Sequence, residues 1–372
     1  MGLMRLGLAL IVLIFHAGYG GGGGSYALYG FYVISGYLIT RVYVEQYSKA
    51  PMGILIFYGN RALRILPLFF ISSLLTYLSI IIVSKIPTID YKAIPVNGIR
   101  YFTDPIFSLA DYWSGLKPEP VIKLQPAPQF VIYFGWLPQF WTISIEFLFY
   151  AVTPAFLFAR KVYGPRASHL LLLATFSIYA IYSIIPGDSN IGLYADIVYR
   201  NAIPTMFFFI VGMNLYELQL ITKFRIKYHY VICSTLMVVS LILIGSRHIN
   251  LGLPVVYEFI IWQVIAAIGI IPIIFSAESR SAIMKKIDIF SADISYGVYL
   301  NQSIVLTFYF SYRLSINNTD FLNKTPFLYY LIISLLTIGI SYFTYIYVER
   351  PINNLKFRLK QKFNITSNIN GY

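Results

Sequence analysis

Cysteine is almost absent from this 372-residue chain. The single cysteine, Cys233, lies in an apolar run, so an intramolecular disulfide and a metal site built from several cysteines are both excluded. Charged residues are also scarce, at 12%, whereas 58% of the residues are hydrophobic and 18% aromatic. A soluble globular domain carries about twice that charged fraction. The composition therefore excludes a soluble globular protein of ordinary type and indicates a membrane protein.

Two further patterns are missing. No internal repeat is visible in the sequence, although secondary transporters commonly contain inverted repeats with interrupted helices in matching positions. The glycine run at 20–24 lacks the Lys-Ser/Thr that completes a phosphate-binding loop. We interpret this run as a flexible connector, or as bare backbone that lets a large substrate approach the neighbouring His16.

Long apolar runs make up most of the chain. Runs long enough to cross a bilayer, about 17 to 25 residues each, lie at 3–19, 26–44, 64–84, 138–159, 168–185, 200–219, 228–245, 254–275, 291–313 and 326–348. We therefore predict an all-α, polytopic integral membrane protein with about ten transmembrane helices. Its transmembrane domain would cover 1–350 and be followed by a basic cytoplasmic tail at 351–372.

Basic residues predict the orientation of these helices, because positive side chains near helix ends stay preferentially on the cytoplasmic side. With both termini cytoplasmic, the inner segments hold 18 of the 28 lysines and arginines. The net charge of +13 then reflects topology and attraction to anionic lipids rather than nucleic-acid binding. A signal peptide is the alternative for the first run, but no A-x-A cleavage site precedes the glycines.

Ionisable residues within the apolar runs are few, and they are costly in a bilayer unless they line a cavity, find a partner or serve a function. They are His16, Glu146, Glu258 and Asp293, with Arg5, Arg41 and Glu217 near the ends of runs. Arg5 and His16 are eleven residues apart, so three helical turns place them on nearly the same face, about 16 Å apart along the axis. The structural alternatives are that Arg5 reaches to lipid head groups and that His16 makes an interhelical hydrogen bond.

Six short motifs follow one another along the chain. They are Arg5-x10-His16, GFYVISGYLI (30–39), RALRILP (61–67), WTISIEFLFY (141–150), ISYGVYL (294–300) and VERP (348–351). In this order they resemble the signatures of the membrane-bound acyltransferase 3 family, the bacterial surface-glycan O-acyltransferase type. The resemblance covers almost the whole chain.

The resemblance implies a fold and an activity. It implies ten helices in the bacterial plasma (inner) membrane and transfer of an acyl group to a sugar hydroxyl of a cell-surface or secreted glycan. The donor would be acyl-CoA, commonly acetyl-CoA, acting as a co-substrate, with no permanently bound cofactor and no metal. The acceptor would be a glycan or a lipid-linked glycan, and membrane lipids would surround the protein.

The chain departs from the family pattern at three places. No acidic residue precedes Arg5, Phe147 stands where a second acidic residue often follows the glutamate, and Asn301 follows Leu300 where a histidine often closes the motif. Arg5 and His16, which the family treats as catalytic, are both retained. A mechanism that needs a second histidine is not supported.

The chemistry of acyl transfer suggests roles for these residues. His16 is the expected general base, because neutral imidazole, with an unperturbed pKa of about 6.5, can take the proton of an attacking hydroxyl. Glu146 could orient that imidazole or instead pair with an arginine such as Arg64. Arg61 and Arg64, three residues apart and so on one helix face, could bind the donor's phosphates together with Arg5, or merely follow the positive-inside rule.

Three motif positions have both structural and functional interpretations. Ser35 and Gly36 could shape a channel or stabilise the developing oxyanion, or simply allow helices to pack. We expect Pro67 in the first turn of its helix and Asp293 near a helix start, where it could be a cap.

Two other functions remain as alternatives. A transporter or flippase for a glycan-lipid or small solute would also show ten helices and a few buried ionisable residues. The other polytopic membrane acyltransferase family usually has its histidine late in the chain, but His229 and His248 lie at the ends of runs.

The long outer loop at 85–130 could bind the acceptor.

Overall fold

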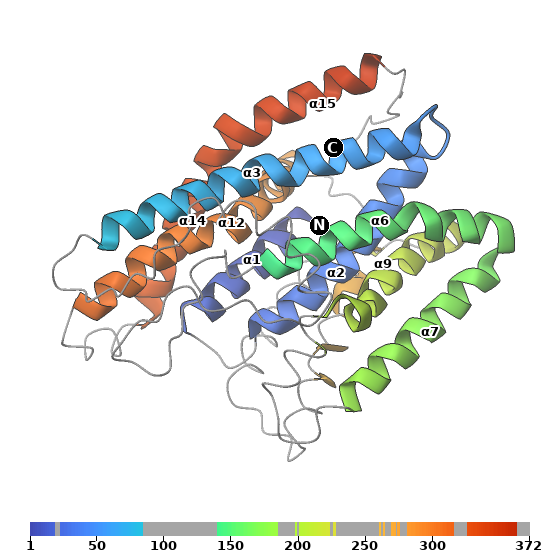
Figure 1. The fold of residues 1–372 in the computed structure, drawn as a ribbon, viewed down its shortest axis with the longest axis horizontal. Helices are drawn as coiled ribbons and strands as arrows, with labels where there is room; N and C mark the ends of the chain where they lie inside the picture. Colours follow the sequence, from blue (N-terminus) through green and yellow to red (C-terminus); the bar gives the residue numbers. More distant parts are fainter. Residues whose placement is uncertain are drawn as a thin grey trace. The chain divides into compact units, whose positions relative to one another are not determined.

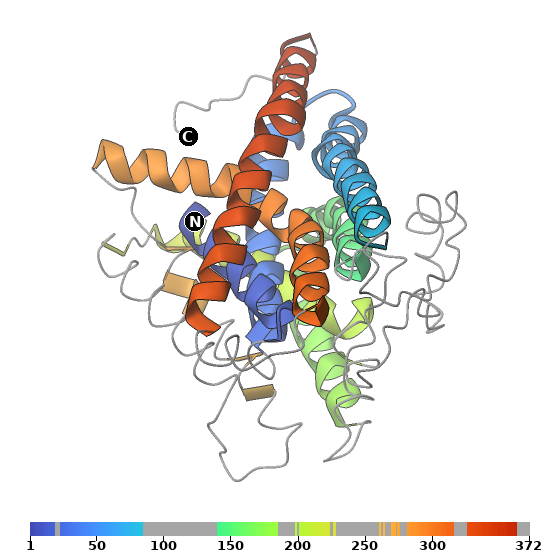
Figure 2. The same cartoon turned by 90° about the vertical axis from the view of Figure 1, so that its left-hand side faces the viewer.

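The computed structural model describes residues 1–18, 23–84, 140–184, 201–223, 281–315 and 326–362, with isolated positions between 198 and 275. Most of these residues are helical, and they form no β-sheet among themselves (Figures 1 and 2). The all-α prediction is thereby confirmed for the described part of the chain. The predicted outer loop at 85–130, the run at 228–245 and Glu258 lie outside it.

The helices follow the apolar runs of the sequence. In chain order they are α1 (Gly2–His16), α2 (Gly23–Val42), the π-helical turn η1 (Tyr43–Tyr47), α3 (Gly53–Ser84), α6 (Phe140–Tyr163), α7 (Pro165–Ile184), α9 (Ala202–Thr222), α12 (Ala282–Ser315), α14 (Pro326–Thr344), the π-helical turn η3 (Tyr345–Glu349) and α15 (Arg350–Lys362). Eight of the ten predicted runs coincide with these helices.

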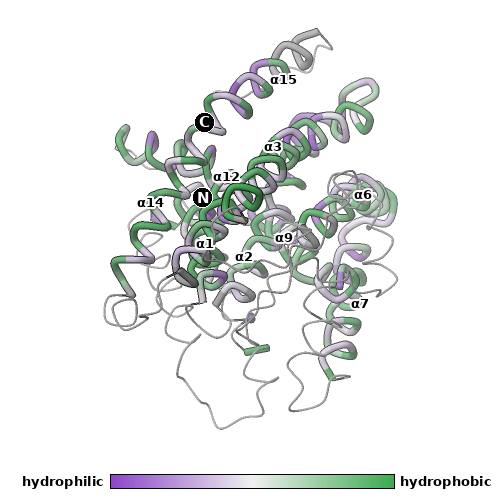
Figure 3. Tube along the Cα trace, turned by 60° about the vertical axis from the view of Figure 1, so that its left-hand side comes forward, coloured by the Kyte–Doolittle hydropathy of each residue, from purple (hydrophilic) through white to green (hydrophobic). Residues whose placement is uncertain are grey.

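Five described helical segments are long and apolar enough to cross a membrane. They are Tyr26–Tyr47, Gly53–Val83, Pro165–Ile184, Ala202–Thr222 and Phe327–Lys356. Figure 3 shows hydrophobic residues along most of the helices and a mixture of hydrophilic and hydrophobic ones in the coloured part of α15, which occupies part of the predicted basic tail. The count of ten spans and the cytoplasmic placement of both termini stay predictions.

Two helices begin earlier than predicted. α3 starts at Gly53, eleven residues before the apolar run, and α12 starts at Ala282, nine residues before it. An apolar run is a poor guide to a helix start, because a helix continues through polar residues such as Asn60 until a breaker interrupts it. The expectations for Pro67 and Asp293 are therefore wrong, since both lie well inside their helices.

The described chain forms two compact units. The first consists of Met1–Ala62, Ile145–Asp293 and Asn354–Tyr372. Its core is aromatic: the rings of Phe149 on α6 and Phe209 on α9 stack with centroids 4.2 Å apart, and Tyr29 on α2 lies 4.3 Å from Phe208. These contacts join α2, α6 and α9.

Glycine permits a very close contact between α2 and α9 in the first unit. A Cβ atom on Gly36 would lie 2.0 Å from the carbonyl oxygen of Phe209, and one on Gly212 would lie 2.0 Å from that of Val33. Neither position has space for any side chain. Small residues at such crossings let helix backbones approach closely, which is a main source of helix association in membranes.

The second unit consists of Leu63–Ser144 and Ile294–Asn353. A buried amide links its three long helices: the Ser72 hydroxyl on α3 donates to Oδ1 of Asn301 at 2.7 Å, and Nδ2 of Asn301 donates to Oγ1 of Thr344 at 2.9 Å. Asn301 is fully buried. The residue that stands in place of a family histidine therefore joins α3, α12 and α14.

We expect Gly212→Ala to destabilise the first unit, because its Cβ would meet backbone atoms that cannot move aside. Overpacking of this kind lowers the free energy of unfolding by about 1–3 kcal/mol, which thermal unfolding of the detergent-solubilised protein would measure. Gly59→Ala is the matched control, since a Cβ there meets nothing within 4 Å and alanine is the better helix former. Equal thermal stability of the two variants would contradict the close crossing.

Candidate active site

Two of the three residues expected to take part in catalysis, Arg5 and His16, lie on α1, which is continuous from Gly2 to His16. The third, Glu146, lies on α6. Arg5 is the fourth residue of α1 and His16 is its last, and both side chains are partly buried. The His16 ring lies 5.4 Å from that of Phe15, centroid to centroid. Because the helix is unbroken, the distance of about 16 Å between their levels on the axis is fixed.

The start of α1 lies directly against α12. The backbone N–H of Leu3 donates to Oδ1 of Asp288 at 3.0 Å, which satisfies one of the amides that every helix N-terminus leaves unpaired. A Cβ on Gly2 would lie 1.8 Å from the Asp288 carbonyl oxygen. This contact fixes the level of Arg5, one turn further along α1.

Glu146 and Arg61 belong to one cluster in the first unit, with Tyr150 between them. The Tyr150 hydroxyl, one turn after Glu146 on α6, donates to Oε1 of Glu146. The Arg61 guanidinium on α3 lies 5.8 Å from the centre of the Tyr150 ring and 5.7 Å from that of Phe57, within the range of cation–π attraction. We call these four residues the Arg61 cluster.

The Arg61 guanidinium has an unusual environment for a cation. Its Nε is buried and has no hydrogen-bond partner among the described residues, although the side chain also interacts with the Tyr47 hydroxyl. Arg64 follows one turn later on α3 and is partly buried. Contact of Glu146 with His16, and its alternative pairing with Arg64, both stay predictions.

Gly36 occupies the α2–α9 crossing, and its carbonyl oxygen accepts from the Thr40 hydroxyl at 2.8 Å. These contacts give Gly36 a packing role. Ser35, its neighbour on α2, is partly buried. An oxyanion role for the two residues stays a prediction.

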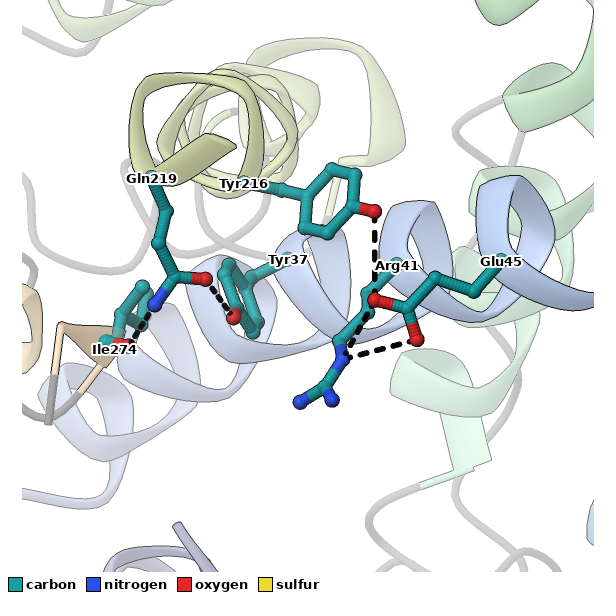
Figure 4. Close-up of polar contacts among 6 residues, drawn as sticks. All are labelled: Tyr37, Arg41, Glu45, Tyr216, Gln219 and Ile274. Atoms are coloured by element: carbon teal, nitrogen blue, oxygen red, sulfur yellow. Dashed lines mark hydrogen bonds and ion pairs between the residues drawn. The ribbon is translucent and has the colours of Figure 1, made fainter. Parts of the chain in front are cut away.

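A polar network beside this crossing was not anticipated from the sequence (Figure 4). The Tyr37 hydroxyl donates to Oε1 of Gln219 at 2.5 Å, and Nε2 of Gln219 donates to the Ile274 carbonyl at 3.0 Å. Nearby, Nε of Arg41 donates to Glu45 at 3.1 Å, one turn along the same helical stretch. The only sequence signal was the i, i+4 spacing of Arg41 and Glu45.

Glu217, one of the ionisable residues noted in the sequence, has partners on two other helices. It forms an ion pair with Arg160 of α6 and accepts from the Ser168 hydroxyl of α7 at 3.2 Å. A buried carboxylate with a cation and a hydroxyl donor fits a structural role.

Comparison with known families identifies the chain. A family model for an acyltransferase domain, that of acyltransferase 3, matches residues 1–346. The chain belongs to the acyltransferase 3 family. This confirms the resemblance seen in the six motifs and shows the chain to be a membrane acyltransferase. No curated protein and no solved structure matches the chain.

Membership in the acyltransferase 3 family argues against the transporter interpretation, since the match extends over nearly the whole apolar domain. The matched range also includes Arg5, His16, Arg61, Glu146 and Asn301.

We expect Asp288→Ala to loosen the first turn of α1 in this acyltransferase. Loss of a capping acceptor costs about 1 kcal/mol, so hydrogen–deuterium exchange in that turn should rise about fivefold. Asp288→Asn keeps an oxygen acceptor for the Leu3 amide, so hydrogen–deuterium exchange in the first turn should increase less in this variant. Unchanged exchange in both variants would show that Asp288 does not hold α1.

Proposed function

We propose that this acyltransferase moves an acyl group, acetyl from acetyl-CoA, to a hydroxyl of a sugar in a cell-surface or secreted glycan at the bacterial inner membrane. The observation that carries the proposal is α1, where Arg5 and His16 lie on one unbroken helix whose start is fixed on α12. The family match supplies the reaction class.

His16 acts as the general base in this reaction. The sugar hydroxyl attacks the thioester carbonyl carbon while His16 takes the hydroxyl proton, so that a C–O bond forms and a tetrahedral oxyanion appears. Collapse of that intermediate breaks the C–S bond, and the imidazolium returns the proton to the departing thiolate. His16 is the last residue of α1, where the negative end of the helix dipole favours the imidazolium.

Arg61 binds the donor in this proposal. Acyl-CoA carries several phosphates, and arginine is well suited to them because its planar fork makes two parallel hydrogen bonds. The buried Nε of Arg61 has no partner among the described residues, so a phosphate oxygen would satisfy it. Arg64 extends the same helix by one turn, and Arg5 is the third arginine that we assign to the donor.

Glu146 has two competing roles. Its hydrogen bond with Tyr150 holds the aromatic ring beside Arg61, which supports a role in shaping the donor site. Orientation of His16 is the role expected from the reaction chemistry. The two roles predict different results for Tyr150→Phe. This variant should weaken donor binding if Glu146 shapes the donor site, but not if Glu146 orients His16.

We expect His16→Ala and Arg5→Ala each to abolish transfer while the protein still inserts. The test supplies acetyl-CoA labelled in the acetyl group to inside-out vesicles that carry the native glycan, and follows label into glycan. Loss of a general base lowers the rate roughly 10²- to 10⁴-fold. His169→Ala is the matched control, because His169 is an exposed histidine of α7. Near-normal transfer by either test variant would overturn the mechanism.

We expect Arg61→Gln to raise the KM for acetyl-CoA about tenfold to a hundredfold, because a hydrogen bond to a charged group contributes about 1.5–3 kcal/mol. The same vesicle assay, run over a range of donor concentrations, measures it. Lys49→Gln removes an exposed cation just after η1 and should leave KM unchanged. If both variants shift KM equally, general surface charge rather than Arg61 attracts the donor.

A further inference from the structure

A cavity of about 670 Å³ lies in the first unit. Its described lining comes from η1 and the turn after it, the start of α3, the second half of α6 and the start of α7, and includes no residue of α1. Its volume is within the range of small-molecule sites. Neither the proposed catalytic residues nor the Arg61 cluster line it.

Small residues on α6 create the hollow. Ala151, Pro154, Ala155 and Phe158 all line the cavity, and their spacing of three and four residues places them on one helix face. Three of the four side chains are small, so the helix surface is recessed along nearly one and a half turns. The Tyr58 hydroxyl of α3 donates to the Ala151 carbonyl at 2.9 Å and holds the opposite wall in place.

The cavity changes from apolar to basic along α6. Ile54 and Phe158 form part of the apolar wall, whereas Arg160 and Lys161 line the end nearest α7. Arg160 is paired with Glu217, and Lys161 is exposed, so Lys161 adds positive charge at that end. Ser48 also lines the cavity, and its hydroxyl donates to the Val44 carbonyl at 2.7 Å.

The apolar part of the cavity has an exposed rim. Ile54 and Phe158 leave 51% and 67% of their surfaces exposed. In a polytopic membrane protein, large apolar side chains that line a recess and remain exposed are suited to contact with lipid chains. An anion from water would not use this apolar wall.

We propose that the cavity is a binding site for one anionic phospholipid. An acyl chain lies along the recessed face of α6, and the head-group phosphate meets Lys161. Basic pockets between membrane helices favour anionic head groups. Because Tyr58 and Ala151 adjoin Phe57 and Tyr150 in sequence, the bound lipid braces the wall behind the Arg61 cluster.

Photolabelling of the detergent-purified full-length protein tests this proposal, with neither acetyl-CoA nor acceptor present. The probe is phosphatidylglycerol with a diazirine in one acyl chain, compared with phosphatidylcholine carrying the same chain. We expect mass spectrometry to find label on the cavity face of α6 and the start of α3, at least several-fold more with the anionic probe.

Lys161→Glu should lower labelling by the anionic probe several-fold, to the level of the phosphatidylcholine probe. Because Lys161 is exposed, the variant should fold normally. Lys285→Glu, which reverses another exposed lysine outside the cavity lining, should not change labelling. Ala155→Trp fills the recess and should lower labelling by both probes.

Equal labelling by the two lipids, unaffected by Lys161→Glu, would mean ordinary boundary lipid and would overturn the proposal. If Lys161→Glu and Lys285→Glu lowered labelling by the anionic probe equally, general charge attraction would explain the labelling, and the proposal would also be overturned. If a long-chain acyl-CoA displaced the probe better than unlabelled phosphatidylglycerol, the cavity would be a donor site instead. None of these outcomes depends on acetyl transfer, so the two proposals can fail separately.

Discussion

The contact between α2 and α9 at Gly36 and Gly212 is the constraint on which the first unit depends. Two helices in a bilayer gain little from hiding apolar surface from each other, because lipid tails are equally apolar, so close backbone packing and hydrogen bonds must supply the attraction. The reciprocal glycine contacts provide the packing. The Tyr37–Gln219 hydrogen bond on the same two helices adds a directional contact, which fixes their register.

That constraint changes the meaning of the motif GFYVISGYLI. From sequence, Ser35 and Gly36 were candidates for a channel, an oxyanion site or simple helix packing. Gly36 has no space beside it and Tyr37 is engaged by α9, which supports the packing interpretation for Gly36. Asn301 is a parallel case in the second unit, where it hydrogen-bonds to two other helices. Some motif residues of this family therefore serve helix packing and others serve the reaction, and the motif alone does not show which role a residue has.

The sequence located most of the described helices but did not identify the contacts between them. Long apolar runs located eight of the described helices, because burial in lipid requires apolar side chains on every face. They placed the starts of α3 and α12 too late, since polar residues such as Asn60 extend a helix without extending its hydropathy. The pairs Arg160–Glu217 and Leu3–Asp288 join residues far apart in the chain. Such pairs depend on tertiary packing, which cannot be inferred from a single sequence.

Among the described residues of the first unit, Arg61 differs from Arg160 and Arg41 in its surroundings. Arg160 is paired with the buried Glu217, whose carboxylate offsets the cost of removing the arginine from water. Arg41 is paired with Glu45 in a more exposed position. Arg61 instead faces two aromatic rings and keeps a buried Nε unsatisfied among the described residues. An unsatisfied buried donor costs about 1–3 kcal/mol. A phosphate oxygen that accepted a hydrogen bond from this Nε would remove the cost. The same amount of free energy would then contribute to the binding of an anionic donor.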